Sequence, residues 1–473
     1  MGQPNLILVL IDDMGWRDLG CYGSSFYETP HIDRLASEGV RFTDAYAACP
    51  VCSPTRASIV TGKYPATVGI TDWIDWGGQT HPARGRLIDV PYRKDLPEGE
   101  HTLAQALGAA GYATWHVGKW HLGGPGAYPT DYGFDVNIGG CEAGSPGREG
   151  YFSPWGIPVL QDADVPPGTY LTDYLTDQAI ELIEGAGEQP FFLNLWYYTV
   201  HTPIEAKPDT IAKYEAKARR LGLDQIDPMV EGEPFPTEHK RHLRVQRRMF
   251  QSDPVYAAMV EHLDENIGRL LDTLERTGIA EDTIVLFFSD NGGLATAEGS
   301  PTCNAPLAEG KGWMYEGGTR EPLLVRWPGV AQPGTLCAEP VTSTDFYPTL
   351  LEMAGLPLLP EQHVDGVSLV PLLQADGSPP PSLARDTIYW HYPHYGNQGG
   401  TPGCSLRSGD HKLIEFFEDG RLELYNVRDD VSEAHNLAEQ EPALTAELHA
   451  RLVAWRESIV AKIPQPNPDW AAP

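Results

Sequence analysis

Four short apolar runs that end in polar side chains constrain the fold of this chain more than any other feature. They are PNLILVLIDDMG (4–15), YATWHVGKWHLG (112–123), PFFLNLWYYTVHTP (190–203) and TIVLFFSDNGG (283–293). A short, continuous apolar run is typical of a β-strand that is buried on both faces. The four runs therefore predict strands of one sheet, each with Asp, Asn, His or Lys near its carboxyl end.

Helical stretches alternate with these strands, and the clearest are residues 102–111, 174–185 and 254–278. Alternation of strand and helix predicts an α/β fold with a large, mostly parallel central sheet and helices on both faces. In such folds ligands bind outside the carboxyl ends of the strands. The polar groups that follow the four runs are thus candidates for one shared site.

The pattern changes toward the end of the chain. Residues 410–427 contain two β-rich runs around Asp419-Gly420, which is a hairpin signal, and residues 442–463 carry apolar side chains at helical spacing. We therefore expect a catalytic domain over 1–380 and a small C-terminal α+β domain over 381–473. That second domain would hold an antiparallel sheet and one long helix, after a linker rich in Pro, Gly and Ser at 374–383.

Charge and composition exclude several classes of partner. The chain has 34 basic and 65 acidic residues, a formal charge of -31. Such a surface repels nucleic acid and anionic membranes, so neither is expected as a partner. No apolar run reaches the roughly 18 residues of a membrane span. No leader precedes the first strand, so the sequence as printed predicts a cytoplasmic protein, or a periplasmic or secreted one if a leader was removed.

The stretch CPVCSPTR (49–56) leaves several roles open on local grounds. Ser-Pro at 53–54 predicts a short helix over 54–61, with the serine as its N-cap. The start of such a helix, with Arg56 one turn in, suits an anion beside Cys52. A redox or structural thiol pair and inert packing remain alternatives. A zinc site is disfavoured because no second Cys or His pair has matching spacing.

Residues 52–62, CSPTRASIVTG, resemble the signature of the type I sulfatases of the alkaline phosphatase superfamily. In that family the cysteine of Cys-X-Pro-X-Arg is oxidised to formylglycine before folding is complete. Further family motifs follow in family order from residue 5 to about 330, and the C-terminal part resembles the family's small domain more weakly. The resemblance implies a formylglycine formed from Cys52 by a transient formylglycine-generating maturation enzyme.

The resemblance also implies one divalent cation, calcium or else magnesium. Its ligands would be Asp12 and Asp13 after the first strand, Asp290 and Asn291 in SDNGG, and the converted Cys52. Oxygen donors without a thiol or imidazole suit a hard cation of this kind.

Five more side chains match the family's catalytic positions: Arg56, Lys119, His121, His201 and Lys311. By resemblance, the hydrate of residue 52 attacks the sulfur of a sulfate ester and leaves a covalent sulfated enzyme. Arg56, Lys119 and Lys311 would hold the sulfate oxygens. His201, with Lys311, would protonate the departing oxygen, and His121 would take the proton that expels sulfate.

Substrate choice is expected in three loops rich in Trp, Tyr, His and Arg, at 69–86, 141–156 and 391–407. The third resembles bacterial polysaccharide sulfatases that act on galactose-type sugars. We expect exo-acting hydrolysis of galactose or N-acetylgalactosamine sulfates, and of aryl sulfates. The alternatives are a formylglycine-dependent phosphonate monoester or phosphodiester hydrolase and, from another class, an inactive protein that binds sulfated glycans. The oligomeric state is not predicted.

Overall fold

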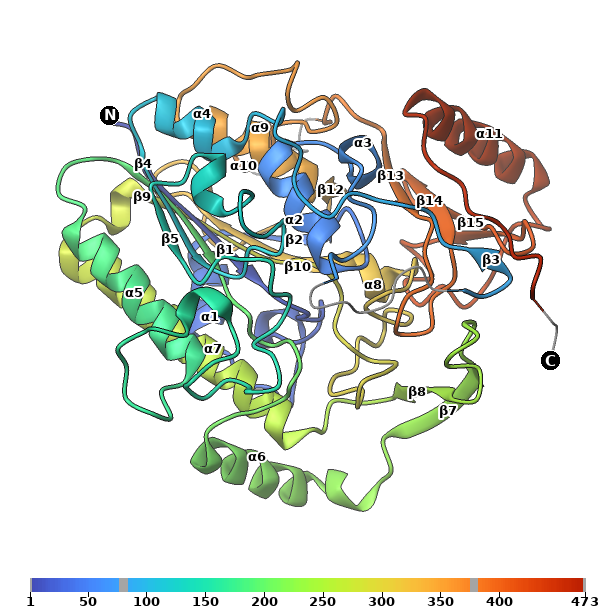
Figure 1. Ribbon diagram of the computed structural model, residues 1–473, viewed down its shortest axis with the longest axis horizontal. Helices are drawn as coiled ribbons and strands as arrows, with labels where there is room; N and C mark the ends of the chain where they lie inside the picture. Colours follow the sequence, from blue (N-terminus) through green and yellow to red (C-terminus); the bar gives the residue numbers. More distant parts are fainter. Residues whose placement is uncertain (1, 76–83, 375–381, 471–473) are drawn as a thin grey trace.

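The computed structural model describes residues 2–75, 84–374 and 382–470 (Figure 1). Its largest sheet has the strand order β11, β2, β10, β9, β1, β6, β4, β5, with β12 beside β2. The order from β9 to β5 is parallel throughout, whereas β10 runs antiparallel to β9 and β2. The bounds are β1 Asn5–Ile11, β2 Val40–Tyr46, β4 Ala113–Gly118, β5 Val136–Ile138, β6 Phe191–Trp196, β9 Thr283–Ser289, β10 Arg320–Arg326, β11 Thr335–Cys337 and β12 Val341–Thr342.

Helices cover both faces of this sheet because both faces of its central strands are apolar. In β1, Ile7, Val9 and Ile11 face one core, and the alternate leucines face the other. Helices α1, α5 and α7 pack on the first face, and α2, α4, α9 and α10 on the second (Figure 1). Their bounds are α1 Pro30–Glu38, α2 Cys52–Thr61, α4 Leu103–Ala109, α5 Leu171–Gly185, α7 Pro254–Thr277, α9 Phe346–Met353 and α10 Val370–Leu373. The predicted α/β fold is confirmed.

The remaining elements are short or peripheral. They are the helices α3 Pro65–Val68, α6 Pro208–Leu221 and α8 Glu316–Thr319, the strand pair β3 Leu87–Ile88 with β17 Gln465–Pro466, the hairpin β7 Met229–Pro234 with β8 Arg244–Arg248, and 3-10 turns at Gly20–Tyr22, Pro129–Tyr132, Pro158–Leu160, Leu223–Gln225, Ala280–Asp282 and Ser343–Asp345. Among the described residues, none of the helices has both the length and the apolar character to cross a membrane.

A second, antiparallel sheet lies near the end of the chain. Its strands are in the order β13 Thr387–Tyr392, β14 Gly403–Ser408, β15 His411–Phe416 and β16 Leu422–Asn426, and it packs against α11, Pro442–Ser458. The predicted hairpin at Asp419-Gly420 joins β15 to β16. This sheet and helix match the expected C-terminal architecture, while the boundary at 380/381 stays a proposal. Most of the expected linker, residues 375–381, lies outside the described residues.

Three features of the fold differ from or extend the sequence prediction. Strands β2 and β10 mix charged and apolar residues, so they lack the continuous apolar run that marked their neighbours. The stretch 391–407, expected to be a loop, is loop only between β13 and β14. The predicted helix over 54–61 begins earlier, at Cys52, with Val51 as its N-cap residue.

A buried ion cluster joins the two sheets. The ammonium of Lys412 in β15 lies 2.9 Å from Glu316 at the start of α8 and 3.2 Å from Glu433, and all three side chains are 0% exposed. Tyr46 of β2 donates a hydrogen bond of 2.7 Å to Glu316. Because a buried charge is costly without a partner, this cluster fixes the second sheet against β2 and α8.

Replacing the central cation tests this cluster. We expect Lys412→Met to lower the free energy of unfolding by about 3 kcal/mol or more, because buried Glu433 loses its counter-charge. Glu316 loses one of its cations and keeps Arg320, at 3.2 Å. Chemical denaturation followed by tryptophan fluorescence measures the loss. The matched control is Arg428→Met, whose side chain is 73% exposed beside Asp410 and should change stability by less than about 0.5 kcal/mol. Equal losses in the two variants would show that the cluster is not a main contact between the sheets.

Candidate active site

The carboxyl ends of β1 and β9 bring four predicted metal ligands together. The two strands are adjacent and parallel, so Asp12 and Asp13 emerge beside Asp290 and Asn291. The backbone N–H of Asp13 points to Asp290 Oδ1 at 3.3 Å, and Asn291 Nδ2 donates to Asp13 Oδ1 at 2.8 Å. All four side chains are buried.

The donor set fits a hard divalent cation. Asp12 Oδ1 and Asn291 Oδ1 are buried and have no hydrogen-bond partner among the described residues. A buried acceptor of this kind normally has a partner, and a cation would supply one. Asp12, Asp13 and His201 also bring ligand atoms to within 4.8 Å of one another. Three carboxylates and an amide oxygen match the preference of calcium or magnesium.

Burial and mutual repulsion raise the proton affinity of two of these carboxylates. Burial, with Asp12 nearby, raises the pKa of Asp290 to about 6. Burial also raises the pKa of Asp12, against the opposing effect of Lys119. On Asp13 burial is outweighed by Lys311 and His201, which lower its pKa. A bound cation would relieve the repulsion among the three carboxylates.

Cys52 occupies the first turn of α2 rather than a position in front of it. The residue is 3% exposed, and every residue of this helix is buried. Ser53 makes no cap, contrary to expectation, because its hydroxyl instead accepts a hydrogen bond of 3.0 Å from the backbone N–H of Ile74. That contact fixes a distant loop against the start of the helix. Burial raises the pKa of the Cys52 thiol.

His121 is the direct neighbour of Cys52. Its Nδ1 lies 3.3 Å from Sγ of Cys52, and its Nε2 lies 2.7 Å from the carbonyl oxygen of Ile74. Burial, and then Lys119, hold the pKa of His121 well below its usual value, so the ring is neutral near pH 7. The ring also lies against Gly144, where an added Cβ would come within 2.6 Å of it. With Nε2–H directed at the carbonyl, Nδ1 is the acceptor that faces Cys52.

Three cations surround the same point. Arg56 contacts Asp290 at 2.7 Å, and Lys119 contacts Asp12 at 2.6 Å. Lys311 contacts Asp13 at 2.7 Å, and that carboxylate raises the pKa of Lys311 although burial opposes it. All three cations are buried, each beside one carboxylate, inside a chain of formal charge -31. Arg56 also donates to the carbonyl oxygen of Lys119 at 2.9 Å.

His201 follows β6 and completes the predicted set. Its Nε2 lies 3.7 Å from Asp13 Oδ2, and its Nδ1 lies 2.8 Å from the carbonyl oxygen of Thr202. Burial, with Lys311, lowers the pKa of His201 to about 4. The structure thus brings all ten predicted site residues to the carboxyl edge of the sheet. Their catalytic roles remain a proposal.

A cavity of about 340 Å³ opens above these side chains. Each of the three predicted substrate loops contributes to its wall, with Trp73 and Ile74, Gly144 and Ser145, and Asn397 and Gln398. Part of the first loop, residues 76–83, lies outside the described residues. Sequence reasoning missed Glu298 and Thr202, which also line the cavity. Glu298 belongs to no motif, and Thr202 lies in the run 190–203, where His201 alone was singled out.

A second acidic cluster lies beneath the first loop. His394 contacts Asp89 through Nδ1, and its Nε2 lies 2.8 Å from the hydroxyl of Thr71. Tyr392 donates to Asp72 at 3.1 Å. These buried contacts tie the loop that carries Trp73 to the segment after β13. The cluster was not predicted because its contacts join residues that lie 305 to 323 positions apart in the sequence.

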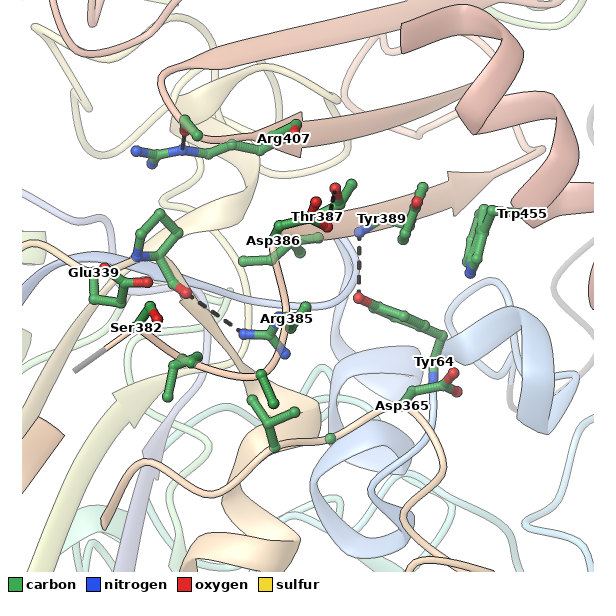
Figure 2. A pocket seen from close by; sticks show the side chains of 18 of the residues that line it. Tyr64, Glu339, Asp365, Ser382, Arg385, Asp386, Thr387, Tyr389, Arg407 and Trp455 are labelled. Atoms are coloured by element: carbon green, nitrogen blue, oxygen red, sulfur yellow. Dashed lines mark hydrogen bonds between the residues drawn. The ribbon is translucent and has the colours of Figure 1, made fainter. Parts of the chain in front are cut away.

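A larger cavity of about 970 Å³ lies between the two sheets, away from these residues (Figure 2). Tyr64, Tyr389 and Trp455 form one side, and the rings of the last two stack at 4.6 Å. Its arginines are engaged, since Arg385 pairs with Asp345 and Arg407 with Asp44. None of the predicted site residues lines this cavity, so the chemistry belongs to the smaller one.

Comparison with known proteins identifies the family. The chain matches the Sulfatase family model over residues 4–356 and the model for N-sulphoglucosamine sulphohydrolase, C-terminal, over residues 309–458. This chain is a sulfatase. It is therefore an enzyme that hydrolyses sulfate esters, and members of its family use a metal ion. The resemblance inferred from CSPTRASIVTG is confirmed.

Relatives of this sulfatase span most of its length. It is 32% identical to a sulfatase of Formosa agariphila, over 96% of this chain and 88% of that protein. It is also 32% identical to human arylsulfatase A, over 94% of this chain and 81% of that protein. The crystal structure of Ps i-CgsB in complex with k-i-k-neocarrahexaose is 27% identical, with a TM-score of 0.75, and covers 99% of this chain and 94% of that one.

Calcium titration tests the metal assignment. We expect calcium at about 100 times its Kd to stabilise the protein by about 2.7 kcal/mol. Asp13→Asn should lose most of this gain, because it removes one ligand charge, while Asn tolerates the left-handed backbone at this position (φ 62°). Calorimetric titration and thermal unfolding report binding without reference to activity. Asp162→Asn, in an exposed loop, is the control. An unchanged calcium isotherm in Asp13→Asn would contradict the assignment.

Proposed function

We propose that this sulfatase removes sulfate from the end of a sulfated carbohydrate, with galactose or N-acetylgalactosamine sulfates as the preferred class. The observation that carries the proposal is the cavity of about 340 Å³, where Trp73, Asn397 and Gln398 surround the catalytic residues. An aromatic face beside amide groups suits a sugar ring with hydroxyls. A cavity of this size fits a terminal sugar rather than the middle of a chain.

Relatives support the same substrate class. Human N-acetylgalactosamine-6-sulfatase is 32% identical over 78% of this chain and 66% of that protein. Ps i-CgsB was solved with a hexaose, k-i-k-neocarrahexaose. These properties are those of the relatives. For this chain we propose only the same substrate class, a sulfated glycan.

The residues of the site fit formylglycine-dependent hydrolysis. Formylglycine at position 52, when formed and hydrated, would supply the nucleophile, and the cation would supply a Lewis acid beside it. The Sγ atom of Cys52 stands where an oxygen of that group would lie. Arg56, Lys119 and Lys311 would hold the sulfate oxygens as negative charge builds up on them.

Proton transfer falls to two histidines in our proposal. His121 is neutral and directs Nδ1 at position 52, so it is placed to take a proton there. His201, beside Lys311, is placed to give a proton to the oxygen that leaves the sulfur. The raised pKa of Lys311 keeps its ammonium charged. It lies beside His201 and can itself donate a proton to the oxygen that leaves the sulfur.

The nucleophile is tested by mass and by substitution. We expect a peptide mass spectrum over residues 42–63 to show an aldehyde at position 52. Cys52→Ala should lower turnover of 4-nitrophenyl sulfate by at least about 10⁴-fold, while the unfolding midpoint without added calcium stays within a few degrees of the parent. A thiol in a fully active enzyme would reject the assignment. A thiol in an inactive protein that still binds sulfated sugars would support the glycan-binding alternative.

The same protein preparation tests the alternative function, a phosphonate hydrolase, against the sulfatase. Aryl sulfate and aryl phosphonate esters with the same leaving group should differ in kcat/KM in favour of the sulfate. Both are monoanions, but the sulfate offers three terminal oxygens to the three cations and the phosphonate only two. Faster phosphonate hydrolysis would favour the second candidate.

Leaving-group dependence tests His201. Loss of a general acid should lower kcat for a sugar sulfate about 10²–10⁴-fold, because its alkoxide leaving group needs a proton. The same loss on 4-nitrophenyl sulfate should be less than about tenfold, because nitrophenolate leaves without one. We therefore expect His201→Ala to affect the two substrates unequally, measured as kcat under saturating calcium. Equal losses would assign His201 to binding rather than proton transfer.

A further inference from the structure

Glu298 stands between the catalytic cavity and a second cavity. It lines the first with Lys311 and His201, and it lines the second, of about 510 Å³, with Ile204 and Asp253. Thr202 is the other residue common to both linings. Glu298 is exposed and close enough to Lys311 to raise that group's pKa, after the larger effects of Asp13, Cys52 and Asp12. A substituent of the sulfate-bearing ring beside the scissile ester would meet this carboxylate.

The position of Glu298 is fixed by its surroundings. Gln398, only 4% exposed, donates from Nε2 to Glu298 Oε1 at 2.9 Å. The backbone of Glu298 is left-handed (φ 54°), as is that of Ser300 (φ 43°). Such a turn needs support, and β8 provides it, since the hydroxyl of Ser300 donates to the carbonyl oxygen of Gln246 at 2.7 Å. The carboxylate is thus held at the rim.

Among its described lining residues, the second cavity offers no cation. Pro203, Ile204, Val255 and Pro301 give it an apolar lining, and its charged lining residues are Glu298 and Asp253. Asp253 is already engaged, because it accepts hydrogen bonds from the first turn of α7 and lies 3.5 Å from Arg248. Glu298 therefore dominates the charge that an incoming group meets there.

We propose that Glu298 restricts this enzyme to substrates whose sulfate-bearing unit has no second anionic group beside the scissile ester. This inference rests on the proposed carbohydrate function. It narrows the substrate class to sugars whose sulfate ester is flanked by neutral groups, such as free hydroxyl or acetamido groups. A hydroxyl can donate to the carboxylate, whereas a second sulfate or a uronate carboxylate would be repelled by it. The cations of the site do not compensate, since each is paired with Asp12, Asp13 or Asp290.

Two substrate pairs test the inference on the full-length, calcium-loaded enzyme. The first pair is 4-nitrophenyl sulfate and its analogue with a carboxylate ortho to the sulfate ester, compared by kcat/KM. The second is galactose 6-sulfate and galactose 4,6-disulfate, compared as competitive inhibitors. We expect the parent enzyme to prefer the singly charged member of each pair by about tenfold or more. Glu298→Gln should reduce both ratios to less than about threefold, and the parent's preference should weaken in 0.5 M salt.

Two control variants separate charge from structure. Glu298→Asp keeps the carboxylate in a residue that tolerates the left-handed backbone, so most of the preference should remain. Glu188→Gln changes an exposed carboxylate before β6, at the opposite edge of the sheet, and should leave both ratios unchanged. If Glu298→Gln leaves both ratios unchanged, the inference is overturned. If neither sugar inhibits but the aryl ratio still responds to Glu298→Gln, the carbohydrate function fails and the charge selection stands.

Discussion

The site depends on the balance between three buried carboxylates and three buried cations at the carboxyl edge of the central sheet. Asp12, Asp13 and Asp290 each contact one of Arg56, Lys119 and Lys311. Neither set could remain buried alone, because an isolated charge in such surroundings is costly. The same pairs leave acceptor oxygens without a partner among the described residues, where a divalent cation fits. Metal binding and anion recognition thus depend on one network.

Much of this arrangement could be predicted from the sequence. Strands such as β1 and β9 are buried on both faces, so their apolar runs are continuous and unmistakable, and parallel pairing places the residues that follow them together. Asp12 and Asp290 are therefore neighbours although 278 residues separate them. The motif at Cys52 supplied the chemistry, which periodicity alone could not provide.

What escaped prediction depends on contacts between distant parts of the chain. Ser53 looked like an N-cap, yet its hydroxyl accepts a hydrogen bond from the backbone N–H of Ile74, and the helix begins at Cys52, two residues before the predicted start. Glu298 stands in a loop without periodicity, and only the contact with Gln398, 100 residues on, reveals its position. Strand β10 runs antiparallel, with charged residues at both ends, and no local pattern fixes that direction.

The depth of Cys52 has a consequence for the timing of synthesis. The residue is almost completely enclosed, but Asn397 and Gln398, which help to roof the cavity, are made much later on the ribosome. At about 5–20 residues per second, translation from one to the other takes roughly 17–70 s. During that interval the nascent chain presents position 52 without its finished cover. An enzyme that modifies the thiol can reach it during this interval, and faster translation would shorten the interval.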